Sequence, residues 1–233
     1  MQKTKIPWCD YTINPVKGLC PMHCKTPDGY EYCYAAGERG LYKRFGWNPE
    51  IRFDVQPLLD IERIKTPSRV FVGSTIELFG EWVDAFWLDS IFRTVKDNPQ
   101  HTFIFLSKCP QNLIKYSPYP PNCWIGASAW DFESTAQAIY IGLARIEAKV
   151  KFISFEPLLG ETRLHQADLV DAGINWLIIG SQTQPVKHPR PEGVREIICA
   201  ADQARIPVFV KEPLASYMNI QRREFPDHEG GIK

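Results

Sequence analysis

Three of the seven cysteines lie close together in the sequence, which suits a metal site. Cys20, Cys24 and Cys33 fall within fourteen residues of one another. Thiolates bind soft metals and iron–sulfur clusters, and closely spaced thiolates can share one cluster with little loop-closure entropy. The other four cysteines are scattered, which is typical of small buried side chains: Cys9, Cys109, Cys123 and Cys199.

The number of clustered cysteines bears on the kind of metal. Structural zinc normally takes four protein ligands, whereas a site with one open metal position can engage a substrate or a cofactor. Zinc would need His23 or Cys9 to complete its coordination. The sequence therefore favours an iron–sulfur cluster over zinc, and zinc over plain structural or redox thiols.

Composition limits the classes of protein. The chain has 233 residues, 44% of them hydrophobic, enough to fill a sizeable core. Its 27 basic and 27 acidic side chains create no global positive field, so any polyanion site must be local. No run of about 18 apolar residues occurs, and no signal-peptide pattern begins the sequence. We expect a cytoplasmic protein with no membrane partner.

Short apolar runs alternate with longer amphipathic stretches, which indicates a parallel sheet with helical crossovers. Strands are expected at Trp8–Ile13, Arg69–Gly73, Thr102–Leu106, Cys123–Ala127, Val150–Phe155, Trp176–Gly180 and Pro207–Val210. Helices are expected near 34–44, 81–97, 110–116, 131–147, 163–172 and 191–205.

This pattern predicts an α/β fold. We expect a single domain that forms a complete or partial β/α barrel with about six or seven parallel strands. The domain spans residues 1–214, with a cysteine loop at about 14–36 and a polar tail at 215–233. The alternative is an open doubly wound sheet, which is disfavoured because no Gly-rich phosphate turn follows any strand.

Polar residues follow almost every expected strand, at the end that carries the active site in β/α barrels. They are Ser74, Thr75, Glu77, Ser107, Lys108, Ser128, Glu156, Ser181, Gln182, Lys211 and Glu212. Each alone is equally consistent with a helix cap or a loop hydrogen bond. Their recurrence predicts a shared polar mouth, in which Lys211 is a possible partner for Glu156.

The cysteine spacing resembles that of a known superfamily. Cys20-x3-Cys24 followed by Tyr32-Cys33 is similar to the radical SAM signature C-x3-C-x-aromatic-C, with six additional residues before the last two positions. The surrounding residues are similar to those of spore photoproduct lyases. Other stretches, such as 14–18, 32–35, 99–103, 154–160 and 178–181, resemble an uncharacterised phage-type family grouped with radical SAM proteins, although Gln182 replaces the Glu usual there.

The resemblance implies a function and roles for individual residues. Cys20, Cys24 and Cys33 would hold a [4Fe–4S] cluster that cleaves S-adenosylmethionine (SAM) to a 5′-deoxyadenosyl radical. SAM would contact residues from the cluster loop and the strand ends: Tyr32, Ser74, Thr75, Glu77, Lys108, Ser128 and Ser181. Tyr34 and Glu156 are the candidate catalytic residues.

The resemblance also implies partners. A flavodoxin or ferredoxin would donate electrons, and the substrate is expected to be nucleic acid or a nucleotide only by analogy. Two alternatives remain open. One is a zinc-stabilised module that binds nucleic acid or protein without catalysis, and the other is an iron–sulfur electron carrier.

Overall fold

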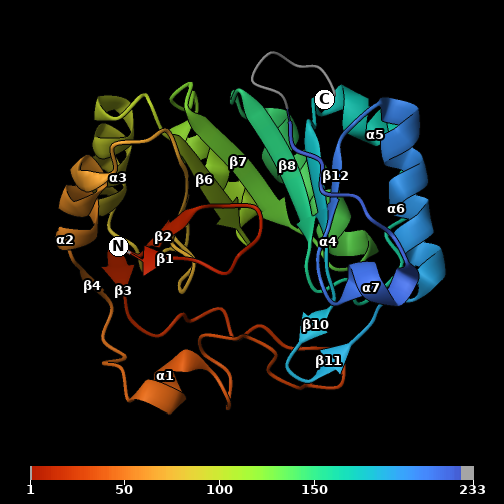
Figure 1. The fold of residues 1–233 in the computed structure, drawn as a ribbon, viewed down its shortest axis with the longest axis horizontal. Helices are drawn as coiled ribbons and strands as arrows, with labels where there is room; N and C mark the ends of the chain where they lie inside the picture. Colours follow the sequence, from red (N-terminus) through yellow and green to blue (C-terminus); the bar gives the residue numbers. More distant parts are fainter. Residues whose placement is uncertain (1, 227–233) are drawn as a thin grey trace. The chain divides into compact units, whose positions relative to one another are not determined.

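The computed structural model describes residues 2–226 and is an α/β protein with an open sheet (Figure 1). Its eight strands are hydrogen-bonded in the order β1-β2-β5-β6-β7-β8-β9-β12. The β1 strand is antiparallel to β2, and the other seven form the parallel part. Because the order ends at β1 and β12 without returning, the sheet has the partial form of the expected barrel. The α/β class is confirmed.

Apart from β1, which was not expected, the strands of this sheet match the sequence-based expectations closely. They are β1 (Gln2–Lys3), β2 (Tyr11–Ile13), β5 (Arg69–Val72), β6 (Thr102–Ser107), β7 (Cys123–Ser128), β8 (Val150–Phe155), β9 (Trp176–Ile179) and β12 (Val208–Val210). Two short antiparallel pairs lie outside it: β3 (Val16–Lys17) with β4 (Arg52–Phe53), and β10 (Gln182–Thr183) with β11 (Val186–Lys187).

The helical elements are shorter and more varied than the sequence predicts. The α-helices are α1 (Leu41–Phe45), α2 (Gln56–Leu59), α3 (Ala85–Asp97), α4 (Phe132–Ala136), α5 (Gln166–Asp171), α6 (Pro191–Ala204) and α7 (Leu214–Met218). The 3₁₀ helices are η1 (Asp60–Arg63), η2 (Pro110–Tyr116) and η4 (Leu143–Arg145), and η3 (Gln137–Gly142) is a π-helix. No helix within residues 2–226 is long and apolar enough to cross a membrane.

The chain divides into two compact units. The first comprises the chain up to Ser107 together with Tyr119–Trp124, and the second comprises Lys108–Pro118 and the chain from Ile125 onward. The expected boundary at residue 214 falls at the start of α7, in the second unit.

In the first unit, α3 packs against the parallel strands. Val72 on β5 pairs with Phe105 on β6, and both side chains are buried. The helix begins at Asp84, whose carboxylate accepts the N–H of Phe86 at 2.8 Å, a typical N-cap. Its buried positions 88, 91, 92 and 95 recur at helical spacing, and the Phe92 ring lies 5.2 Å from that of Phe105. This apolar stripe fixes α3 on the sheet.

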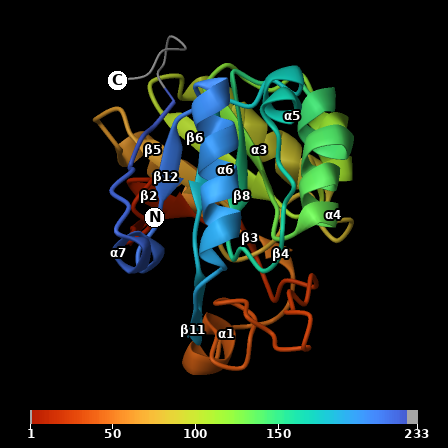
Figure 2. The ribbon, with the colours of Figure 1, turned by 90° about the vertical axis from the view of Figure 1, so that its right-hand side faces the viewer.

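In the second unit, β8, β9 and β12 run parallel, and every residue of β9 is buried. Helix α6 begins with Pro191 and turns a buried stripe inward at Val194, Ile197 and Ala201. Figure 2 shows α6 extending along the strands of this unit. The α5 helix packs against α6.

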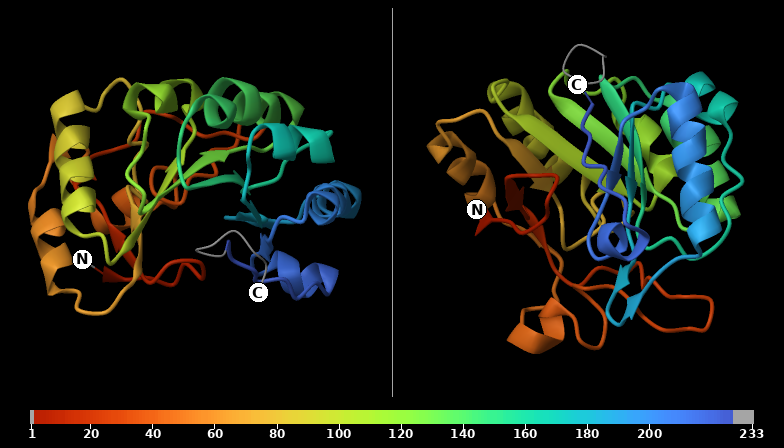
Figure 3. Two further views of the ribbon diagram at one scale, coloured as in Figure 1. Left: turned by 90° about the horizontal axis from the view of Figure 1, so that it is seen from above. Right: turned by 45° about the vertical axis from the view of Figure 1, so that its right-hand side comes forward.

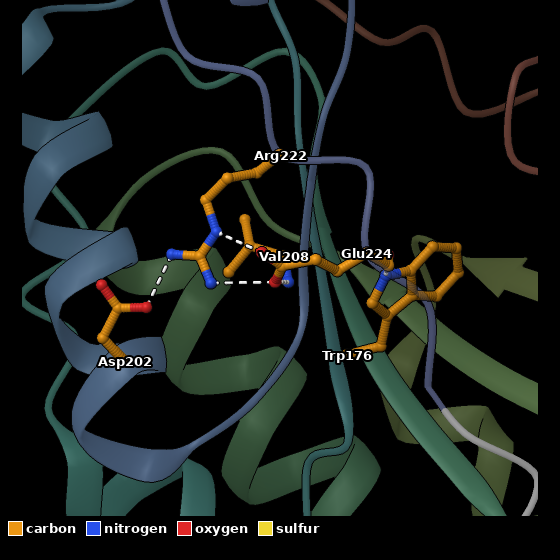
Figure 4. Close-up of polar contacts among 5 residues, drawn as sticks. All are labelled: Trp176, Asp202, Val208, Arg222 and Glu224. Carbon is orange, nitrogen blue, oxygen red and sulfur yellow. Dashed lines mark hydrogen bonds and ion pairs between the residues drawn. The ribbon is translucent and has the colours of Figure 1, made fainter. Parts of the chain in front are cut away.

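A short segment after α7 covers the free edge of β12, and we call residues 222–224 the C-terminal clasp (Figure 4). The Arg222 guanidinium donates to both carboxylate oxygens of Glu224, each at 2.8 Å, and to Asp202 on α6 at 2.6 Å. Backbone bonds run from the Val210 N–H to the Arg222 carbonyl and from the Glu224 N–H to the Val208 carbonyl. The clasp therefore acts as a short antiparallel partner for β12.

The predicted extents of two helices are wrong: one helix is shorter than expected and the other is divided. The helix expected at 34–44 is only Leu41–Phe45, because the chain turns tightly at Gly37 and Gly40. A Cβ atom at Gly37 would lie 2.6 Å from the Cys33 carbonyl oxygen, and one at Gly40 would lie 2.5 Å from that of Ala35. The helix expected at 131–147 is divided into α4, η3 and η4. Amphipathic spacing alone does not reveal such interruptions.

Candidate functional site

The three clustered cysteines lie in the first unit, on an irregular stretch after β2 that we call the cysteine segment (residues 14–47). Cys20 is buried, Cys24 and Cys33 are partly exposed, and none of the three forms a disulfide. Figure 3 shows that α1, which lies in this segment, stands apart from α2 and α3 of the same unit. The segment therefore has little helix or sheet around it.

The additional residues between Cys24 and Cys33 form a closed excursion of the chain. Lys25 and Glu31 form an isolated antiparallel bridge, and a turn at Gly29, which has φ +84°, reverses the chain between them. The Tyr32 N–H donates to the Cys24 carbonyl at 3.2 Å. The excursion thus begins and ends at one place, and Cys24 and Tyr32 are neighbours despite the additional residues.

Two of the three sulfur atoms accept backbone hydrogen bonds. The Glu77 N–H lies 3.4 Å from Cys20 Sγ, and the Ala36 N–H lies 3.4 Å from Cys33 Sγ. Burial raises the pKa of the Cys20 thiol, and the nearby Glu77 carboxylate raises it further, while backbone N–H groups oppose the shift. Without a cation beside it, the Cys20 thiol is therefore protonated at neutral pH.

The cysteines are not yet arranged as a metal site. Within residues 2–226, no group of three or more His, Cys, Asp or Glu side chains is positioned to hold a metal ion. The side chain of His23, the possible fourth zinc ligand, is 66% exposed, and its Nδ1 lies 3.2 Å from Glu31 Oε1 in the excursion. The donors are present, but their arrangement is open.

Polar residues at the strand ends of the first unit bond to one another and to the cysteine segment. Asn14, directly after β2, bonds to Ser74 Oγ at 3.2 Å and accepts the Thr75 N–H at 3.2 Å. The Tyr34 hydroxyl donates to the Ser74 carbonyl. The segment is thereby tied to the end of β5. Sequence reasoning gave Asn14 no role at the site, although its position directly after a strand was the available signal.

Glu77 is a buried carboxylate with defined partners. Its Oε1 accepts the Phe79 N–H and the Ser107 hydroxyl, both at 2.9 Å. Its own N–H points to Cys20, as described above. This residue therefore joins the ends of β5 and β6 to the first cysteine, and its contact with SAM stays a prediction.

The remaining predicted residues lie in the second unit. The Lys108 ammonium lies 5.3 Å from the centre of the Trp130 ring, and Ser128 is buried. Glu156 and Lys211 form an ion pair, which confirms that expected contact. That these residues and the cysteines line one common site stays a prediction.

The end of β9 holds a contact that sequence reasoning missed. Ser181 Oγ lies 2.8 Å from His188 Nδ1, and the imidazole stacks on Tyr217 with ring centroids 4.1 Å apart. Gln182 donates to the carbonyls of Gln184 and Pro185. The chain returns through the β10–β11 hairpin, and this turn, which the sequence pattern did not reveal, places His188 next to Ser181.

Comparison with known proteins gives a family but no activity. Residues 3–227 match the model of a family described as a protein of unknown function, DUF5131. The chain belongs to the DUF5131 family. The match includes the cysteine segment and every strand end named above. No curated protein and no solved structure matches the chain.

Proposed function

We propose that this DUF5131 protein is a radical SAM enzyme in which Cys20, Cys24 and Cys33 hold a [4Fe–4S] cluster. The observation that carries the proposal is the closed excursion between Cys24 and Tyr32. The Tyr32 N–H to Cys24 carbonyl bond at 3.2 Å brings the second cysteine beside the aromatic-cysteine pair. Cys24 and Tyr32 are therefore neighbours in space, although six additional residues separate them in the sequence.

The donor chemistry of the segment supports a cluster more than a zinc ion. The three thiols form no disulfide, and those of Cys20 and Cys33 accept backbone N–H groups, a type of contact that tunes iron–sulfur potentials. The raised pKa of Cys20 means that a strong positive charge must replace its proton. Because no metal group is assembled within residues 2–226, we expect the segment to rearrange as the cluster is loaded.

The bound cofactors supply the radical chemistry, namely reductive cleavage of the SAM sulfonium by the cluster. The protein's own residues bind and orient SAM. Asn14 and Tyr34 hold the end of β5, where Ser74 and Thr75 offer partners for SAM. In the second unit, Lys108 can meet a carboxylate, Ser128 and Ser181 can bond to ribose or amino groups, and Glu156 is held by Lys211.

Anaerobic reconstitution with metal analysis tests the cluster. We expect about four irons per chain, lost in Cys20→Ala, Cys24→Ala and Cys33→Ala. The control variants are Cys199→Ala, at an exposed site on α6, and Cys9→Ala, in the core of the first unit. Both should retain the iron. A colourless protein with a single zinc contradicts the proposal and supports the binding-module alternative, and equal iron loss in the controls overturns the ligand assignment.

Cleavage of SAM separates an enzyme from an electron carrier. The reduced, loaded protein should release 5′-deoxyadenosine with either dithionite or a flavodoxin as the electron donor. Lys108→Ala should weaken SAM binding, whereas Lys115→Ala, an exposed lysine of η2, should not. A loaded protein that never cleaves SAM is an electron carrier.

A further inference from the structure

One surface of the cysteine segment combines exposed aromatic rings with positive charge. We call it the aromatic–basic surface: Arg39, Lys43, Arg44, Phe45 and Trp47. All five residues are exposed, and Phe45 and Trp47 retain 58% and 44% of their accessible area. Exposed apolar side chains that lie together and are rimmed by polar residues are a feature of interaction sites.

The two rings are stacked on one another, and we call this stacked pair the platform. Their centroids lie 5.8 Å apart and their planes are within 23° of parallel. The Arg44 guanidinium lies over the Phe45 ring, 5.4 Å from its centre. Helix α1 ends at Gly46 with φ +60°, and this left-handed turn directs the chain to Trp47.

The basic side chains of this surface are not used in ion pairs of the described residues. None of the ion pairs among residues 2–226 uses Arg39, Lys43 or Arg44, although other exposed arginines of the chain are paired. Nearly parallel rings suit another flat ring, and free cations suit phosphates. The chain has no net charge, so this is the kind of local polyanion site that its composition allows.

The platform is anchored to the cysteine segment. The Trp47 ring packs edge-on against the buried Tyr42 at 5.4 Å, and the Tyr42 hydroxyl accepts the Gly18 N–H at 2.9 Å. The Leu41 N–H donates to the carbonyl of Tyr34, the residue after Cys33. The platform and the proposed cluster ligands therefore belong to one connected loop system.

We propose that the aromatic–basic surface binds single-stranded nucleic acid, with a base extending the Phe45–Trp47 stack and phosphates bound by Arg39, Lys43 and Arg44. Stacking needs an unpaired base, which excludes a regular duplex. A membrane is disfavoured because α1 has only five residues and presents no extended apolar face. The identification of nucleic acid as the substrate class rests on the proposed function, but the binding itself requires no cluster.

Fluorescence anisotropy with a labelled, mixed-sequence single-stranded oligonucleotide tests the proposal. Trp47→Ala and Phe45→Ala should each weaken binding about 5- to 100-fold, the range for loss of one stacked base, and Trp47→Phe should restore most of the affinity. The double variant Lys43→Gln/Arg44→Gln should reduce the dependence of log K on log salt by about 1.4 for single strands. Circular dichroism checks that each variant is folded.

Matched controls place the effect at this surface. Phe86→Ala removes an equally exposed ring on α3 of the same unit, and Lys65→Gln removes an exposed cation; both should bind like the parent. The cluster-free Cys33→Ala protein should also bind. If it binds but the parent carries no iron, only the proposed function fails. Unchanged binding in Trp47→Ala, or stronger binding to duplex or to anionic phosphatidylserine vesicles, overturns this inference.

Discussion

The cysteine segment and the C-terminal clasp are both irregular and polar, yet the chain holds them in different ways. The clasp directs its charges at its own unit, through the paired Arg222 and Glu224 and their contact with Asp202. The cysteine segment is held mainly by backbone donors and by the hydroxyls of Tyr34 and Tyr42. Phe45 and Trp47 of this segment stay exposed.

The difference separates a segment that stabilises from one that binds. In the clasp, the charged groups satisfy one another, so little is left for a ligand. In the cysteine segment, many of the bonds include a main-chain group, as at Tyr34 and Tyr42, and Cys24, Cys33, Phe45 and Trp47 keep accessible surface. Weak local restraint is typical of binding loops, which must adjust when a ligand arrives.

The largest expected effect is on the clasp. Glu224→Gln removes the negative charge and one of the two carboxylate oxygens that Arg222 contacts. Asp202 is then the remaining charged partner of Arg222. Hydrogen bonds to charged groups contribute about 2 kcal/mol, so urea unfolding should show a loss of about that size. Arg195→Gln, which breaks an exposed pair on α6, should change stability by less than about 0.5 kcal/mol. Equal losses would remove the distinction between the two regions.

The second effect belongs to the cysteine segment. Gly37→Ala places a Cβ atom 2.6 Å from the Cys33 carbonyl oxygen, so the turn after Cys33 must shift. Such overpacking costs about 1–3 kcal/mol, here confined to the segment. We expect a lower iron content after reconstitution, with the main unfolding transition nearly unchanged. Gly193→Ala, in helix α6 with no atom closer than 3.8 Å, should leave iron content unaltered.

Tyr42→Phe should have a smaller effect on the same segment. It removes the acceptor of the Gly18 N–H in a buried position, a loss of about 1 kcal/mol. Hydrogen exchange should become faster at residues 18–20 and 41–47 and stay unchanged in β5 and β6. Tyr217→Phe, on the exposed side of α7, is the control. Uniformly faster exchange would mean that the segment and the sheet open together.

The smallest effect is the pH dependence of the clasp. Burial alone would raise the pKa of Glu224, but hydrogen bonds from Arg222 and the Val208 N–H outweigh it and lower the pKa. A carboxyl group with a lowered folded pKa stabilises the fold above its unfolded pKa, and this contribution is lost as pH falls through the folded value. The stability difference between the parent and Glu224→Gln should therefore shrink below about pH 4.5.

The sequence predicted the parallel strands well because their apolar runs are nearly continuous. It also predicted the Glu156–Lys211 pair from two residues that follow separate strands. It failed where a single backbone turn decides the structure, as at Gly37, which shortens the helix after Cys33. It also missed His188 beside Ser181, because the β10–β11 hairpin that joins them is too short to show a pattern.

The clasp also has a consequence for assembly. An uncovered edge strand offers its N–H and C=O groups to any other chain, and natural proteins suppress such templates. Here β12 gains its antiparallel partner from residues that follow it in the chain. During synthesis, the β12 edge stays open to aggregation until the clasp has emerged from the ribosome, and a truncation before Arg222 would leave it open permanently.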